Sequence, residues 1–130
     1  MSTVTDFGHD RVEKFSNTGN FLFTWGTTGS AAGMFNGPDG IAFDGLDGIY
    51  VADVSNHRIQ KFSTSGSSRW TLGAQGSGDG EFEQPTGVAL NSSHELYVAD
   101  HGNNRIQKFG EIPTPSTPAT LGQVKDHYRR

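Results

Sequence analysis

The chain has 130 residues, with 10 Lys and Arg against 14 Asp and Glu, 18 Gly and no Cys, and its formal net charge is −4. The lack of cysteine excludes disulfide scaffolds, thiolate zinc sites and cysteine nucleophiles, and the negative charge disfavours non-specific binding to nucleic-acid phosphates. The longest apolar runs, 49–52 and 96–99, are far shorter than the roughly 20 residues of a membrane helix, and the first ten residues lack the basic start and apolar core of a signal peptide. We expect a soluble chain that does not bind a membrane, and its compartment stays unknown.

One segment of the chain recurs twice, in steps of 47 residues. Residues 4–15 recur as 51–62 and again as 98–109, without a gap. Residues 35–62 and 82–109 are identical at 14 of 28 positions, which chance does not produce. A period of this length is typical of propellers and solenoids.

In chain order, the repeat predicts a partial unit over 1–34, a full unit over 35–81 and a second partial unit over 82–110. The chain opens within the second strand of the first unit. Short apolar or alternating runs, bounded by Gly, Asn and Asp turns, predict the strands. They fall around 4–6, 11–15 and 21–25, then at 39–43, 48–53, 58–62 and 69–72, and last at 86–90, 95–100 and 105–109.

Residues 111–130 make up the last segment of the chain. Three prolines between 111 and 118 predict an extended linker. The candidate for one further strand is 119–124, where the run Thr-Leu-Gly resembles the same run at 71–73.

Four short strands in each unit favour an all-β fold built from four-stranded antiparallel blades of the β-propeller type. The array is incomplete, with roughly 2.5 to 3 blades against the 4–8 of closed propellers. An incomplete stack leaves two blade faces in water, where they mark an interaction site or an aggregation hazard. Three alternatives stay open: a piece of a longer array, a ring of two copies, or a lone arc. We favour the open array, with self-association, including a homodimer, as its consequence.

Specific segments resemble the NHL repeat. They are Gly40–Asp44, Ile49–Asp53 and Asn56–Phe62, with their counterparts at 87–90, 96–100 and 103–109. The resemblance covers residues 4 to about 109. It implies a β-propeller, commonly with six blades, that binds proteins, RNA or other ligands.

An Asp-x-x-Asn-x-Arg pattern recurs in the units, with His9 replacing the Asn in the first. A catalytic site needs one asymmetric group of residues, whereas this pattern is repeated. An Asp that ends a strand can accept bonds from turn amides and pair with a nearby Arg. We therefore predict no catalytic residue, and a structural network of Asp6, Arg11, Asp53, Arg58, Asp100 and Arg105.

The histidines do not share one repeat position, so their spacing does not converge on a metal site. They are His9, His57, His94, His101 and His127. The glycine-rich connectors also lack the Lys-Ser or Lys-Thr pair of a phosphate loop. We predict no metal and no cofactor.

In a propeller, the loops between second and third strands share a face with the blade-to-blade connectors. This arrangement predicts a binding face at Ser55, Asn56, His57, His101, Asn103 and Asn104. Acidic residues in the second connector disfavour RNA, so a protein partner fits best. The expected function is a non-enzymatic module for binding or scaffolding. The alternatives are a piece of a propeller enzyme that resembles an amidating lyase or a lactonase, or of the substrate- or RNA-binding NHL domain of a tripartite-motif ubiquitin ligase.

Overall fold

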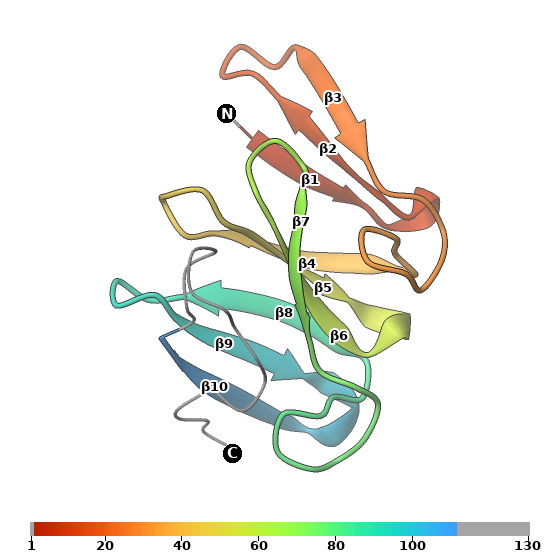
Figure 1. Ribbon diagram of the computed structural model, residues 1–130, viewed down its shortest axis with the longest axis vertical. Coiled ribbons are helices and arrows are strands. Elements are labelled where there is room, and N and C mark those ends of the chain that lie inside the picture. Colours follow the sequence, from red (N-terminus) through yellow and green to blue (C-terminus); the bar gives the residue numbers. More distant parts are fainter. Residues whose placement is uncertain (1, 112–130) are drawn as a thin grey trace.

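Three antiparallel β-sheets form the part of the chain that the computed structural model describes, residues 2–111 (Figure 1). The strands are β1 (Ser2–Asp6), β2 (Arg11–Phe15), β3 (Phe21–Trp25), β4 (Pro38–Phe43), β5 (Ile49–Asp53), β6 (Arg58–Phe62), β7 (Ser68–Leu72), β8 (Pro85–Leu90), β9 (Glu95–Asp100) and β10 (Arg105–Glu111). Short 3-10 turns follow β1, β5 and β9, namely η1 (Phe7–His9), η2 (Val54–Asn56) and η3 (His101–Asn103). The fold is all-β, as the repeat predicts.

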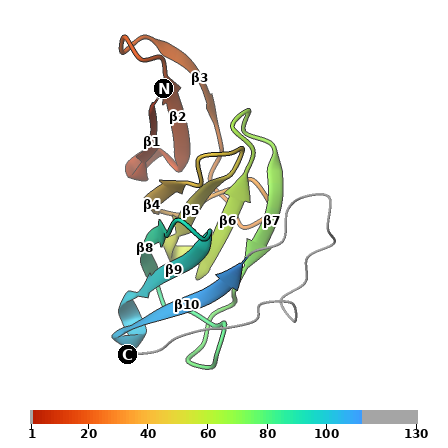
Figure 2. The same cartoon turned by 90° about the vertical axis from the view of Figure 1, so that its left-hand side faces the viewer.

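Each sheet corresponds to one blade, in which every strand pairs with its neighbour in sequence. Strands β1–β3 form blade 1, β4–β7 form the four-stranded blade 2, and β8–β10 form blade 3. Strand β4 of blade 2 packs against both β1 and β8, so the three blades stack in one row. Figures 1 and 2 show this stack from two sides. The architecture is that of partial propeller blades.

The observed strands differ from the predicted ones mainly at their ends. Strand β10 continues to Glu111, which pairs with Glu95 beyond an irregularity after Phe109. One residue of the predicted linker therefore belongs to the sheet. The loops predicted after each second strand contain 3-10 turns, which the repeat pattern did not indicate. The strand predicted at 119–124 lies outside the described residues.

The apolar core lies between the blades. All five residues of β5 are buried, because blade 2 is covered on both faces. One cluster joins Val12 of blade 1 to Val51 and Phe62 of blade 2. Phe35 and Phe82, one at the end of each blade-to-blade connector, are fully buried in the two clusters. Burial of a phenylalanine side chain contributes roughly 1.5–3 kcal/mol, so these two rings are major anchors between blades.

The first and last blades each leave one face exposed. Val4 of blade 1 is 46% exposed, whereas its counterparts Val51 and Val98 are fully buried. Ile106 of blade 3 is 38% exposed, whereas its counterpart Ile59 is fully buried. The same repeat position is thus buried wherever a neighbouring blade covers it. We call the surface around Val4 the first outer face and that around Ile106 the second outer face.

The connector between blades 1 and 2 offers a matched test of this packing. Gly26 and Gly33 both have positive φ values, +105° and +86°. A Cβ at Gly26 would lie 2.6 Å from the Phe35 ring, whereas a Cβ at Gly33 would meet open space. We expect Gly33→Ala to lose about 1 kcal/mol from backbone strain alone, and Gly26→Ala to lose about 1–3 kcal/mol more from overpacking. Urea unfolding of both variants measures the difference, and equal losses would contradict the packing role of Phe35.

Candidate binding face

The three 3-10 turns and the two connectors, residues 26–37 and 73–84, lie along one edge of the molecule (Figure 1). Backbone hydrogen bonds join them. The Ser55 amide donates to the Asn36 carbonyl at 3.0 Å, and the Gly102 amide donates to the Glu83 carbonyl at 2.7 Å. We call these turns and connectors together the binding face.

The Asp53 carboxylate organises this edge in blade 2. It is fully buried at the end of β5. One oxygen accepts from the backbone amide of Asn36 at 2.8 Å. The other accepts from Arg58 Nε at 2.8 Å and from the side-chain amides of Asn56 and Gln60, both at 3.0 Å. A buried carboxylate is stable only when its lone pairs are occupied in this way.

Arg58 carries the network from the carboxylate into the connector. Its two terminal nitrogens donate to the backbone carbonyls of Ser30, Ala31 and Met34 at 2.8–3.0 Å. Gln60 also donates to the Met34 carbonyl, at 2.6 Å. The guanidinium has five fixed donors and no acceptor, so it suits a ring of carbonyl oxygens. The connector is therefore held by side chains of the following blade.

Blade 3 repeats the same network around Asp100, which is also fully buried. Arg105 Nε donates to Asp100 at 2.8 Å, and the terminal nitrogens of Arg105 donate to the carbonyls of Ser77, Gly78 and Glu81 at 2.8–2.9 Å. The geometry matches blade 2 almost bond for bond. The pattern thus serves in both blades to attach a connector.

Blade 1 has a more open version of this network. Asp6 is hydrogen-bonded to His9 Nδ1 at 3.0 Å and accepts from Arg11 Nε at 3.2 Å. The His9 hydrogen bond, together with the charge of Arg11, lowers the pKa of the Asp6 carboxyl. Arg11 Nη2 forms an ion pair with Glu13 Oε2 at 3.1 Å, whereas the terminal nitrogens of Arg58 donate to connector carbonyls. His9 therefore occupies the place that Asn56 takes in blade 2.

A second repeated position joins each blade to the next. Asp10, His57 and Asn104 all have left-handed φ values of 52–53° at the end of their 3-10 turns. One oxygen of Asp10 accepts from the Gly37 amide at 2.7 Å. His57 Nδ1 accepts from the Gln84 amide, one repeat later, at 3.0 Å. These side chains fix the start of the next blade's inner strand.

The predicted binding residues therefore divide into two groups. Asn56, Asn103 and His57 are engaged in bonds to carboxylates, connector carbonyls or connector amides. Ser55, His101 and Asn104 are exposed on the binding face. Phe7, at the start of η1, also lies on this face and is 61% exposed. It occupies the same repeat position as His101.

Within residues 2–111, His, Asp and Glu side chains form no group of three or more that could hold a metal ion. No helix in the same range is long and apolar enough to cross a membrane.

The stacked blades and their carboxylate-held connectors define a repeat protein of the propeller-blade class. The family model of the NHL repeat matches residues 35–62 and 82–109. The chain thus contains two NHL repeats, each of which runs from the buried connector phenylalanine to the repeated phenylalanine of the third strand, Phe62 or Phe109. No curated protein matches the chain.

The network predicts a large difference between two aspartates at equivalent positions. Asp53→Ala leaves Arg58 and three further donors without their buried acceptor, so we expect a loss of about 3–5 kcal/mol in the free energy of unfolding. Asp6→Ala, whose side chain is 25% exposed and surrounded by fewer donors, serves as the control and is expected to lose far less. Urea unfolding monitored by tryptophan fluorescence compares the two. An Asp53→Ala variant as stable as the wild type would contradict the structural role.

Proposed function

We propose that this NHL-repeat chain is a non-enzymatic recognition module whose binding face holds a protein partner. The observation that carries the proposal is that the buried carboxylates of Asp53 and Asp100 are occupied by hydrogen bonds from within the chain. All four donors to each buried carboxylate come from the chain itself. The charged groups therefore build a rigid scaffold, and recognition falls to the exposed side chains between them.

The exposed side chains vary among the repeats, whereas the Asp and Arg of the scaffold are present in all three units. Phe7, Val54 and His101 occupy one repeat position, and Ser55 has glycine as its counterpart in the other units. Variable side chains on a fixed scaffold are typical of recognition loops. A scaffold held by backbone bonds also reduces the entropy lost on binding.

Phe7 is the strongest candidate for an anchor on this face. Its ring is 61% exposed and lies beside the Gly37 backbone, where an added Cβ would be 3.2 Å from the ring. Exposed aromatic rings at the centre of an interface commonly contribute most of its binding energy. Glu83, in the second connector, adds negative charge near His57, which fits a protein partner better than a polyanion.

Affinity capture with quantitative mass spectrometry tests this face. The double variant Phe7→Ser, His101→Ser removes the largest exposed ring and one exposed imidazole. We expect at least one protein to be retained by the wild type and its retention to fall about tenfold in the double variant, which corresponds to an anchor worth about 1.4 kcal/mol.

The matched control is Leu46→Ser, because Leu46 is 69% exposed in the hairpin between β4 and β5, at the opposite edge. It should retain the same protein as the wild type. A loss that is equal in the control and the double variant would contradict a role for the binding face.

We further propose that the two outer faces join copies of this chain head to tail. The supporting observation is that Val4 and Ile106 are exposed only because no blade covers them. The first outer face of one copy can then cover the second outer face of another, in the way that blade 1 covers blade 2. Such a contact is heterologous, because the two surfaces differ.

Light scattering on a sizing column, across a concentration series, tests the head-to-tail contact. We expect the wild type to exceed the 14.0 kDa mass of one chain, and Ile106→Glu to return to that mass, because it places a charge in an apolar interface. Leu46→Glu, at an exposed site away from both outer faces, should keep the larger mass. A monomeric wild type at all concentrations would contradict the proposal.

A further inference from the structure

Blade 2 contains a row of three side chains across its strands, in which a lysine lies between two aromatic rings. Tyr50 pairs with Lys61 between β5 and β6, and Lys61 pairs with Trp70 between β6 and β7. Lys61 Nζ is 5.2 Å from the centroid of the Tyr50 ring and 6.0 Å from that of Trp70. Burial lowers the pKa of the Lys61 ammonium and raises that of the Tyr50 phenol. Cation–π contacts of this kind strengthen when water is excluded.

Blade 1 has the same row with one ring missing. Thr3 pairs with Lys14, and Lys14 pairs with Phe23, in the same register as in blade 2. Lys14 Nζ is 5.4 Å from the centroid of the Phe23 ring, but its other neighbour is the small Thr3 side chain. The Lys14 side chain is nevertheless buried, and its Nζ donates to the Thr64 carbonyl at 2.7 Å. Its ammonium thus has one aromatic partner where Lys61 has two.

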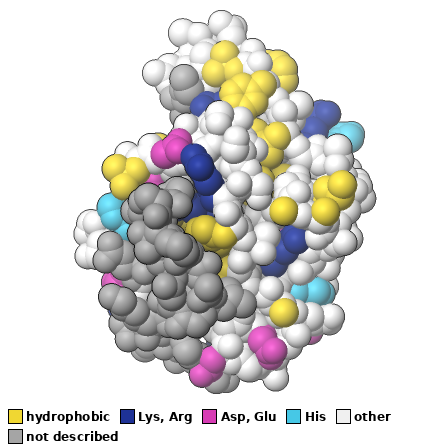
Figure 3. Space-filling view, viewed as in Figure 1, with side chains coloured by type: hydrophobic (Ala, Val, Ile, Leu, Met, Phe, Trp, Pro, Cys, Tyr) yellow, Lys and Arg dark blue, Asp and Glu magenta, His cyan; other side chains and the backbone are white. Residues whose placement is uncertain are grey.

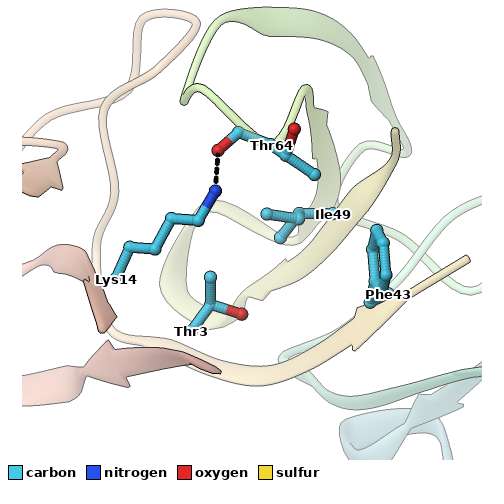
Figure 4. Close-up of a pocket in the computed structure, with 5 residues that line it drawn as sticks. All are labelled: Thr3, Lys14, Phe43, Ile49 and Thr64. Atoms are coloured by element: carbon cyan, nitrogen blue, oxygen red, sulfur yellow. Dashed lines mark hydrogen bonds between the residues drawn. The ribbon is translucent and has the colours of Figure 1, made fainter. Parts of the chain in front are cut away.

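A cavity of about 260 Å³ lies where the second ring would be. It is lined by Thr3, Lys14, Phe43, Ile49 and Thr64. Figure 4 shows these side chains around one space, with Lys14 directed toward the Thr64 carbonyl. An engineered apolar cavity of about 150 Å³ already accommodates benzene, so this space is large enough for one aromatic ring.

The interface between blades 2 and 3 shows what fills the equivalent space. There, Tyr50 lies in one buried cluster with Leu96 of blade 3, against which Leu90 also packs, and it is only 2% exposed. Ile49 and Phe43 are the counterparts of those two leucines at the interface between blades 1 and 2. The cavity therefore has the surroundings of a tyrosine ring without the tyrosine.

We propose that this cavity binds a small neutral aromatic molecule of the phenol class, which completes the aromatic pair around Lys14. The ring would lie against Ile49 and Phe43, as Tyr50 lies against the leucines of blade 3. The site lies by the hairpin between β4 and β5, at the end of β5 opposite Asp53. It is therefore distinct from the binding face and does not depend on the proposed protein partner.

The probe for this site is p-cresol, the free analogue of a tyrosine side chain. Calorimetry and amide chemical shifts of the whole chain measure its binding. We expect saturable binding of one molecule, with shifts at Thr3, Lys14 and Ile49. The saturated analogue 4-methylcyclohexanol has a similar shape but no π face, so it should bind about tenfold more weakly. Equal binding of the two molecules, or no saturable binding of p-cresol, would overturn the proposal.

Substitutions then locate the site. Thr3→Tyr restores the ring of blades 2 and 3 and should abolish p-cresol binding, whereas Thr3→Val keeps the cavity and should bind as the wild type does. Lys14→Met keeps most of the side-chain volume without the cation and should weaken binding about tenfold. This variant provides an independent test if Thr3→Tyr does not fold. Undiminished binding to a folded Thr3→Tyr variant would place the ligand elsewhere and refute the assignment.

Discussion

The structure depends on two carboxylates that have no contact with water, Asp53 and Asp100. A buried charge without partners costs several kcal/mol, so each of these groups must collect donors from several parts of the chain. For Asp53 the donors come from a connector amide, from η2 and from β6. The chain can satisfy the carboxylate only when the second strand, the third strand and the connector meet at one point. In blades 2 and 3, one buried charge thus fixes the point where the two strands and the connector meet.

The residues that build the scaffold are therefore different from those that form its exposed surface. Arg58 and Arg105 have their guanidinium groups occupied by the aspartates and by connector carbonyls, so neither is available to a phosphate or a carboxylate of a ligand. The side chains that face water on the same edge, such as Phe7 and His101, make no part of that network. They can differ between repeats without disturbing the junction of strands and connector, because that junction is built from other residues.

The sequence predicted the strands and the Asp–Arg spacing, because both repeat in register and follow known local rules. It did not predict that Gln60 reaches the Met34 carbonyl, 26 residues earlier in the chain, since no local rule links a strand glutamine to a distant connector. Nor did it predict that His57 Nδ1 accepts a hydrogen bond from the Gln84 amide, 27 residues later in the chain. In the repeat alignment, Thr3 stands where blade 2 has Tyr50. This replacement of a large residue by a small one predicts a cavity only when the positions of the surrounding side chains are known.

The two faces of a blade differ, and this difference limits what can cover the outer faces. In blade 2, one face presents Val51 and Phe62 to blade 1, and the other presents Tyr50 and Ile59 to blade 3. The side chains alternate because successive residues of a strand point to opposite faces. A blade face is therefore complementary to the opposite face of another blade and not to itself. A two-fold contact between identical faces would pair two surfaces of the same shape, whereas a head-to-tail contact reproduces the packing already present twice in the chain. For this reason, the self-association that we propose has head-to-tail order, in which each outer face meets the opposite kind of face.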